Sequence, residues 1–228
     1  MRLDTLSIIE FKNIAEQRLE LSSGINCFVG DNGAGKTNVL DAIYYLSMSK
    51  SAFTMTDGQS VRHGEEFFFT GGTYSTDGGG QEQVVCSFSR RTGKVLKRNG
   101  KEYDRVADHV GLFPVVIVSP RDTDLITDAA EERRRYLNGF ISQLDRVYLN
   151  SIMRYNAVLT ERNRFLKGSS DEAMLQIYDM QLAEHGTRVY EARQKMVERM
   201  QPMVAEYYRT LSDDREQVEI EYRSELQD

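Results

Sequence analysis

The sequence contains little cysteine and no long hydrophobic run, and each shortage argues against a class of protein. Two cysteines, Cys27 and Cys86, stand among 228 residues, which disfavours a disulfide framework or a cysteine-rich metal site. Both lie in apolar runs typical of strands, so we expect buried, reduced thiols. No segment approaches the roughly 18 consecutive apolar residues of a membrane-spanning helix, and residues 1–4 lack the pattern of a secretory signal. We therefore expect a cytoplasmic protein without membrane contact.

An excess of positive charge is also missing. The formal net charge is −6, so any contact with nucleic acid needs a local basic surface rather than an overall attraction. The hydrophobic fraction of 40% and the chain length suffice for a real core, in one large domain or two small lobes.

Apolar runs predict a strand-rich first lobe over residues 1–121, with a mixed α/β fold. Strands are expected at residues 3–9, 18–21, 25–29, 67–74, 84–88, 95–98 and 115–118. Helical spacing of apolar residues predicts a helix from residue 38 to 48, directly after a glycine-rich turn. A polar loop is expected at 76–80, and Asn99-Gly100 suits a tight hairpin turn.

Helical patterns dominate residues 122–215 and predict a second lobe that contains a short helical hairpin. Its turn is expected at the polar break 168–170, where Ser170 or Asp171 suits the cap of the next helix. A mostly apolar packing seam follows at helical spacing: Leu175, Tyr178, Leu182, His185, Val189, Ala192, Met196, Arg199 and Met203. Residues 218–222 alternate like a half-exposed strand, so residues 216–228 are expected to begin a further strand region.

A phosphate-binding motif, G-x-x-x-x-G-K-[ST], is formed by Gly30, Asp31, Asn32, Gly33, Ala34, Gly35, Lys36 and Thr37. Its glycines let backbone N–H groups surround a phosphate, Lys36 would reach the β- and γ-phosphates, and Thr37 would place its hydroxyl on Mg²⁺. The helix that follows directs its positive end at the anion. An accidental match is the alternative, but strand, loop and helix stand in the required order. The expected ligands are ATP and Mg²⁺.

A hydrolase also needs a carboxylate for the Mg²⁺ shell and a group that orients water, usually after another buried strand. The strand predicted at 115–118 leads into Ser119, Pro120, Arg121 and Asp122 rather than into paired acids. We interpret these residues as a loop similar to a Q-loop, with Ser119 and Asp122 as candidate contacts to the Mg²⁺ or the water.

Further motifs carry a resemblance to a known family. Residues 33–43, with Phe11-Lys12-Asn13 upstream, resemble the SMC, Rad50 and RecF branch of ATP-binding-cassette (ABC) ATPases. Within that branch, several runs are similar to the RecF family in order and spacing: 118–122, 132–138, 155–156, 162–163 and 166–167. The similarity runs through most of the chain. Arg121 departs from the family, which usually has an acidic residue there.

The resemblance implies an ABC-type P-loop ATPase head, with a strand-rich lobe I and a helical lobe II whose short arms replace long coiled coils. It implies that Lys12, Asn13 and Asn38 lie near the nucleotide, and that Arg62 corresponds to an arginine that follows the first helix. The signature motif and the Walker B strand would lie beyond residue 228. The chain is therefore expected to be a fragment without catalytic residues of its own.

The resemblance also implies partners. RecF proteins use ATP to close a homodimer on DNA near junctions of single and double strands, and they cooperate with RecO and RecR to load RecA at gaps. By this resemblance we expect gapped or junction DNA, a second copy of the protein, RecO and RecR as partners, in DNA repair, replication and the SOS response.

Two groups of basic residues are candidates for DNA contact. Arg133, Arg134 and Arg135 on a predicted helix could bridge phosphates, or could pair with neighbouring acids such as Asp128 and Glu132. Alternation in the hairpin region would bring several of a second group onto one exposed face: Arg90, Arg91, Lys94, Lys97, Arg98, Lys101 and Arg105. A solvated edge protected by charge explains the second group equally well.

For the histidines and the late methionines we expect structural roles. His185 lies on the packing seam, and His63 and His109 lack the acidic or cysteine partners of a metal site. The series Met196, Met200 and Met203 is expected to fill the core of the hairpin.

These observations favour an ATP-gated DNA-binding protein of recombinational repair and leave rivals. An ATPase-linked nuclease would share the head and would need a nuclease domain beyond residue 228. A small P-loop kinase is disfavoured by the β-rich insertion and the helical arms. The isolated chain could also hold nucleotide with almost no turnover, because the opposing signature is lacking.

Overall fold

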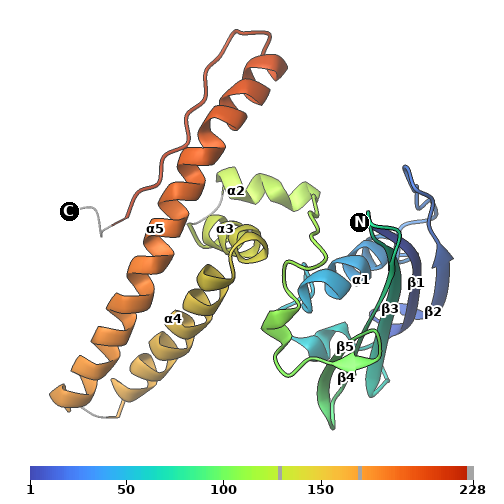
Figure 1. Cartoon of the computed structure of the whole chain (residues 1–228), viewed down its shortest axis with the longest axis horizontal. Helices are drawn as coiled ribbons and strands as arrows, with labels where there is room; N and C mark the ends of the chain where they lie inside the picture. The colour runs from blue at the N-terminus through green and yellow to red at the C-terminus, as the bar shows by residue number, and fades with distance from the viewer. Residues whose placement is uncertain (128–129, 169–170, 225–228) are drawn as a thin grey trace. The chain divides into compact units, whose positions relative to one another are not determined.

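The computed structural model describes residues 1–127, 130–168 and 171–224. Of Arg121, which lies within the first range, it describes the backbone only. It divides into two compact units, Met1–Asp122 and Thr123–Asp228 (Figure 1). Among the helices of the described residues, none has the length and apolar character needed to cross a membrane.

The first unit is built on a six-stranded antiparallel sheet in the order β2-β1-β3-β4-β5-β6 (Figure 1). Its strands are β1 (Arg2–Phe11), β2 (Ile14–Glu20), β3 (Phe67–Ser75), β4 (Gln81–Ser89), β5 (Gly93–Arg98) and β6 (Lys101–Glu102). The tight turn Lys12-Asn13 joins β1 to β2, with Phe11 opposite Ile14. Between β2 and β3 the chain forms helix α1 (Lys36–Met48), which packs on one face of the sheet. The short 3-10 helices are η1 (Asp57–Ser60), η2 (Val106–Asp108) and η3 (Pro120–Thr123).

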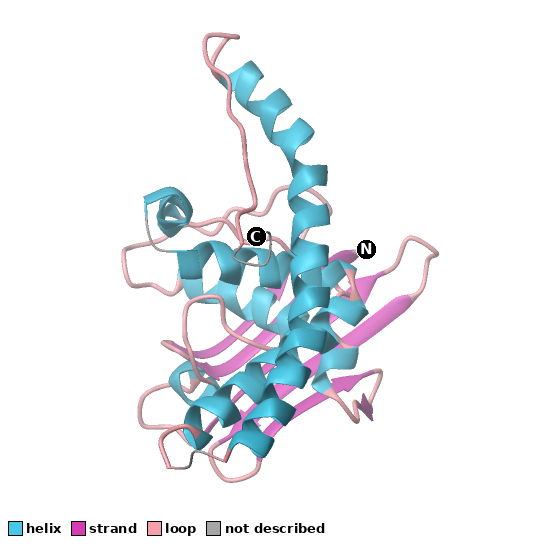
Figure 2. Ribbon diagram, turned by 90° about the vertical axis from the view of Figure 1, so that its left-hand side faces the viewer, coloured by secondary structure: helices cyan, strands magenta, loops and turns pink. Residues whose placement is uncertain are grey.

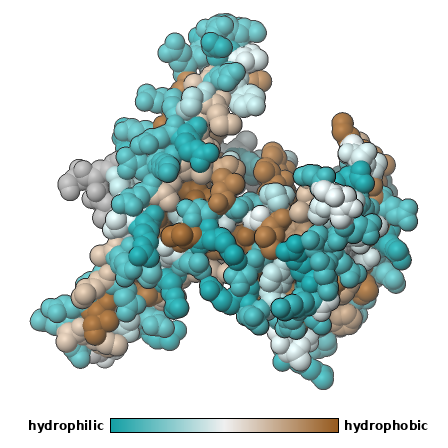
Figure 3. Space-filling view, in the orientation of Figure 1, coloured by the Kyte–Doolittle hydropathy of each residue, from teal (hydrophilic) through white to brown (hydrophobic). Residues whose placement is uncertain are grey.

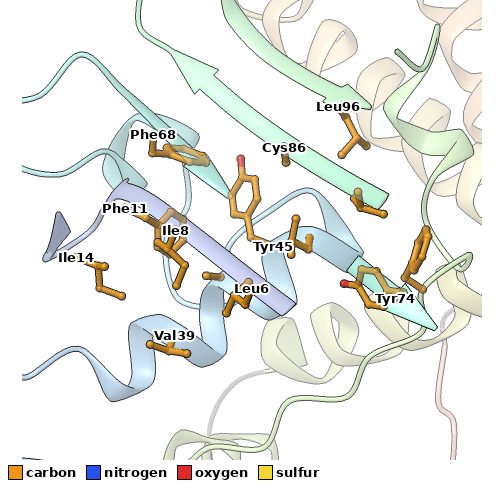
Figure 4. Packing of buried hydrophobic residues seen from close by; sticks show 14 of the residues in the cluster. Leu6, Ile8, Phe11, Ile14, Val39, Tyr45, Phe68, Tyr74, Cys86 and Leu96 are labelled. Atoms are coloured by element: carbon orange, nitrogen blue, oxygen red, sulfur yellow. The ribbon is translucent and has the colours of Figure 1, made fainter. Parts of the chain in front are cut away.

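The core of this unit lies between α1 and the sheet. Leu6 and Ile8 alternate along β1, so both point to the same face, and both are fully buried. The rings of Phe11, Tyr45 and Phe68 meet edge to face, with centroids 5.1 to 5.8 Å apart (Figure 4). This arrangement adds to the apolar burial that holds the helix to the sheet.

Close contacts fix the second half of α1. A Cβ atom at Gly72 would come within 2.9 Å of Cδ1 of Leu46, so the glycine permits the helix to approach β3. His109 is fully buried, and its Nε2 lies 2.6 Å from the carbonyl oxygen of Leu46. Its Nδ1 lies 3.1 Å from the Tyr103 hydroxyl. His109 therefore has the structural role that its sequence context predicts.

Most of the predicted strands are confirmed, but those at 25–29 and 115–118 are wrong. Neither segment joins a ladder within the described residues. Ile25, Val29, Val116 and Val118 are 91%, 89%, 75% and 79% exposed. Figure 3 shows hydrophobic side chains, in brown, among a largely hydrophilic surface. The apolar runs indicate a tendency toward burial, but a strand also needs a neighbour to pair with, and the described residues offer none.

One of the two cysteines lies in a confirmed strand and the other in a segment wrongly predicted as a strand. Cys86 lies in β4 and is buried, as predicted, whereas Cys27 lies in the unpaired 25–29 segment and is exposed. Both thiols are free.

The second unit is helical, with α2 (Asp124–Thr127), α3 (Ala130–Leu144), α4 (Arg146–Phe165) and α5 (Glu172–Leu211). Helices α4 and α5 form the predicted hairpin and lie side by side (Figures 1 and 2). The carboxylate of Asp171 accepts the backbone N–H groups of Ala173 and Met174, which confirms this residue as the cap of α5. The other predicted cap, Ser170, lies outside the described residues.

The packing seam of the hairpin is partly confirmed. Val189 and Met196 are buried, with Ala192 and Met200 packed beside them. Met203 is 57% exposed, so the prediction that it fills the core is wrong. Helix α5 has 40 residues, about 60 Å at 1.5 Å per residue, and extends beyond the region where α3 and α4 cover it. The arm is thus longer than the short one expected.

The strand predicted at 218–222 is also wrong. This segment runs back along α5 (Figure 2). The side-chain amide of Gln201 donates to the carbonyl oxygen of Val218, and its oxygen accepts the N–H of Ile220 at 2.6 Å. The ring of Tyr222 lies 5.8 Å from that of Tyr190. Alternate residues are half-buried because they face the helix, which explains the strand-like pattern without a partner strand.

Candidate phosphate-binding site

The phosphate loop turns at glycines and leads directly into α1. Gly33 and Gly35 have φ angles of 83° and 97°, in the left-handed region that favours glycine. Gly35 is the N-cap of α1, and no side chain caps the helix there. Loop and helix start are therefore joined by a backbone that only glycine adopts without strain.

The amino-terminal end of α1 suits an anion. Its first turn contains no acidic residue, so none of its own side chains opposes the positive end of the helix dipole. The first N–H groups of a helix have no partner within the helix and are open to a phosphate. Thr37 lies in this turn and is exposed, which leaves its hydroxyl accessible to a bound Mg²⁺ ion.

Lys36 lies across the loop. Its Nζ donates to the carbonyl oxygens of Gly30 and Asp31, each at 2.7 Å. The ammonium is thus held by neutral carbonyl groups rather than by a carboxylate. A phosphate in the loop would offer it a charged partner, and charge-assisted hydrogen bonds are stronger than neutral ones.

Asn13 and Asn38 are brought together at the loop. The amide nitrogen of Asn13 donates to the carbonyl oxygen of Gly33 at 2.7 Å, and the amide nitrogen of Asn38 donates to Oδ1 of Asn13 at 2.8 Å. The turn between β1 and β2 therefore contacts both the loop and the first turn of α1.

The other residues implied by family resemblance have partners in the protein. Nζ of Lys12 lies 2.6 Å from Oδ2 of Asp41, a fully buried residue of α1. Arg62 pairs with Glu10 at 3.2 Å. Asp41 was not among the residues predicted for the site, although an acid between the buried positions Val39 and Ala42 is the signal that could have revealed it.

The 119–122 loop is organised by its own side chains. Oδ2 of Asp122 accepts the backbone N–H of Ser119 at 2.9 Å, and Oδ1 accepts the Ser119 hydroxyl at 3.3 Å. The carboxylate thus closes the first turn of η3. Within the described residues, no group of three or more His, Cys, Asp or Glu side chains could hold a metal ion.

Several basic residues of the β4–β5–β6 region were expected on one exposed face, but they are divided between the two faces of the sheet, and some are held in ion pairs. Lys94 and Arg98 lie on the side of the buried Leu96, where Lys94 contacts Asp57 at 2.9 Å. Arg98 makes a bidentate pair with Glu82 at 2.6 and 2.8 Å. Strand alternation places Lys97 on the opposite face. Lys101 is exposed on β6 and is paired with Arg98, so it lies on the Arg98 face.

Arg90 and Arg91 lie in the turn at the other end of β5. Arg90 donates to the carbonyl oxygens of Gly58 and Glu65, at 3.0 and 3.5 Å. The side chain of Arg91 is 84% exposed and lies 4.0 Å from Glu66. These two residues are therefore separated from Lys101 by the length of the strand.

The arginines of α3 make local contacts. Arg135 pairs with Glu132 at 3.1 Å, and Arg133 donates to the carbonyl oxygen of Leu125. Arg134 is exposed. The expected acid Asp128 lies outside the described residues.

Comparison with known proteins supplies relatives. A family model described as an AAA domain matches residues 5–227. The DNA replication and repair protein RecF of Phocaeicola vulgatus is 43% identical over 226 residues, which cover 98% of this chain and 61% of that protein. The chain thus spans about 60% of the length of such relatives.

Solved structures of RecF and of an SMC ATPase are also similar to this chain. The structure described as the recombination mediator protein RecF-ATP in the RecFOR pathway matches with a TM-score of 0.87 and 30% identity. The match covers 93% of this chain and 58% of that one. A structure from work on the ATP-driven dimerization and DNA-stimulated activation of SMC ATPases matches with a TM-score of 0.50 and 17% identity, over 61% of this chain and 99% of that one. The second likeness shows the shared fold alone: a mixed α/β ATPase head with an antiparallel sheet.

Proposed function

The chain belongs to the family described as an AAA domain and is similar to RecF over 98% of its length. We propose that it is the nucleotide-binding part of an ATP-dependent DNA-binding protein of DNA repair and replication. The observation that carries this proposal is the glycine loop Gly30–Gly35, which presents Lys36 and an acid-free helix start to the same point. The RecF-ATP structure supports ATP as the nucleotide.

The residues present fit ATP with Mg²⁺. Lys36 would exchange the carbonyl oxygens of Gly30 and Asp31 for the β- and γ-phosphates, and the N–H groups of the loop and first helical turn would surround the β-phosphate. Thr37 would hold Mg²⁺ through its hydroxyl, and the ion, when bound, offsets phosphate charge. The loop thus binds and orients the triphosphate.

The wider role is that of a recombination mediator. In it, ATP closes a homodimer on gapped or junction DNA, and RecO and RecR cooperate in loading the recombinase, in the cytoplasm and during the SOS response. The RecFOR pathway of the RecF-ATP structure supports the mediator role. An ATPase head of a nuclease remains the rival for the whole protein.

This chain by itself is proposed to bind nucleotide with almost no turnover. The carboxylate of Asp122, the candidate metal contact in the 119–122 loop, is engaged by Ser119. A dimer partner that completes the site would be needed for hydrolysis.

The test is the binding of fluorescent ATP and ADP with Mg²⁺ to wild type and to Lys36→Ala. We expect saturable binding by wild type that is lost in the variant, because the ammonium contacts the phosphates. Lys195→Ala removes a lysine of α5, far along the chain from the loop, and is the matched control that should bind like wild type. Equal binding by Lys36→Ala would refute the loop as the site.

The DNA role needs a chain of the full length of its relatives. Gapped-DNA binding with and without ATP separates the candidates: ATP-dependent binding supports the mediator, DNA cleavage supports the nuclease, and nucleotide binding without a DNA response contradicts both.

A further inference from the structure

Asn13 contacts the phosphate loop and the helix start at once. Its amide nitrogen donates to the carbonyl oxygen of Gly33, and its amide oxygen accepts from Asn38. The amide nitrogen of Asn13 thus binds the loop, and its amide oxygen binds a residue of α1.

The fit between Asn13 and the loop is close. A Cβ atom at Gly35 would lie 2.8 Å from Oδ1 of Asn13 and 3.3 Å from Cγ1 of Ile14. Glycine at position 35 is therefore required by its φ angle of 97° and also by the turn that packs against it.

The turn that carries Asn13 is firmly held. Phe11 and Ile14, the residues that flank the turn, are buried and paired in register. Lys12 has a φ angle of 56°, unusual for a residue with a side chain, and its N–H donates to the carbonyl oxygen of Ser60 at 2.8 Å. Such a conformation persists where the surroundings determine it. Asn13 therefore lies in a turn whose backbone is held in place by its neighbours.

We propose that Asn13 is a positioning residue, which holds the nucleotide-free loop in its phosphate-binding shape by bonding the Gly33 carbonyl and Asn38. This inference rests on the proposed nucleotide binding and adds that the contribution of Asn13 is made before the nucleotide arrives. A preformed loop binds more tightly because less ordering is required on binding.

The test combines amide hydrogen exchange of residues 31–35 in the nucleotide-free protein with the Kd for ADP. Asn13→Ala removes both hydrogen bonds. Asn13→Asp keeps the size of the side chain and the oxygen that accepts from Asn38, but it replaces the donor to the Gly33 carbonyl with an oxygen, so that hydrogen bond is lost. In both variants we expect exchange to speed up and the Kd to rise, by about threefold to tenfold in Asn13→Asp, as for loss of one hydrogen bond, and by more in Asn13→Ala, which loses two.

Asn99→Ala is the matched control, because Asn99 is an exposed asparagine in another hairpin turn whose amide bonds to Gln83 and Glu82. It should change neither quantity, and exchange in β4 should be unchanged in both Asn13 variants. Weaker ADP binding with unchanged loop exchange would make Asn13 a direct ligand and overturn the proposal, as would unchanged binding. If wild type binds no ADP, the proposed function fails, and the exchange measurement alone decides whether Asn13 holds the loop.

Discussion

Nζ of Lys12 lies 2.6 Å from Oδ2 of Asp41, and this ion pair joins the β1–β2 turn to the helix that follows the phosphate loop. The side chain of Asp41 is fully buried and also accepts the Ser51 hydroxyl and the N–H of Ala52, both at 2.7 Å. Lys12 lies over the ring of Phe53 at 5.4 Å, so apolar surface shields the pair from water.

Removal of Lys12 should therefore destabilise the protein. Lys12→Met leaves the Asp41 carboxylate buried with neutral donors only, and we expect the free energy of unfolding in urea to fall by about 3 kcal/mol. The double variant Lys12→Met/Asp41→Asn removes both charges and should be less destabilised than the sum of the two single variants. Additive single effects would show that the two charges do not interact.

The two cysteines should differ sharply in reactivity. Burial raises the pKa of the Cys86 thiol to about 12, whereas Cys27 is exposed. Because the thiolate is the reactive form, a thiol reagent at pH 8 should modify Cys27 rapidly and Cys86 only on unfolding. Cys27→Ser should abolish the rapid phase, and Cys86→Ala should leave it intact. A rapid phase that survives Cys27→Ser would contradict the burial of Cys86.

The same two residues show what a sequence can predict and where it fails. Cys27 and Cys86 both stand in apolar runs, and local pattern cannot distinguish a run that pairs within the described chain from one that does not. The hairpins of the antiparallel sheet were predictable because their strands follow one another in sequence and are joined by turns such as Asn99-Gly100, whose φ angles of 51° and 77° suit a tight hairpin. The pairing of β1 with β3 joins segments that are far apart in the sequence, and no local pattern predicts it.

The candidate site was predictable in its motif and less so in its surroundings. Spacing alone identifies Lys36 and Thr37, because the motif encodes its own geometry. Asn13 in the β1–β2 turn contacts Gly33 in the loop, and Lys12 in the same turn contacts Asp41 in α1. These residues are far apart in the sequence, so no periodicity predicts their contacts. Strand alternation alone predicts that Lys97 and Arg98 lie on two different faces. Only the structure shows which of these faces is buried.

The stability of the first unit should depend on the protonation of His109. Burial lowers the pKa of its imidazole below the ordinary value of 6.5, so the folded protein binds fewer protons than the unfolded chain. The stabilising contribution is complete above pH 6.5 and is lost as the pH falls below it. His109→Gln removes the titration, so its melting temperature should fall less steeply than that of wild type between pH 7.5 and 5. Equal slopes would mean that His109 protonates equally well in both states.

DNA binding by a chain of the full length of its relatives should depend on the lysines of the β5–β6 hairpin, Lys97 or Lys101 according to the face that meets DNA, rather than on Arg98. The Arg98 guanidinium is held by Glu82 and lies 5.9 Å from the centre of the Phe113 ring, whereas Lys97 and Lys101 make no ion pair within the described residues. Lys101 is paired with Arg98, so Lys97 and Lys101 lie on opposite faces, and DNA held by one face contacts one of the two. In Lys97→Glu/Lys101→Glu we expect weaker binding to every DNA sequence and a salt slope reduced by about 1, for one lost phosphate contact.

Lys195→Glu, a charge reversal on α5, is the control for that experiment and should leave both affinity and salt slope near wild type. An unchanged slope in the double variant would place the phosphate contacts elsewhere. The exposed Arg134 of α3 would then be the next residue to reverse, because its neighbours Arg133 and Arg135 already have partners in the protein. A loss of affinity in Arg134→Glu but not in the double variant would assign the DNA surface to the helical unit.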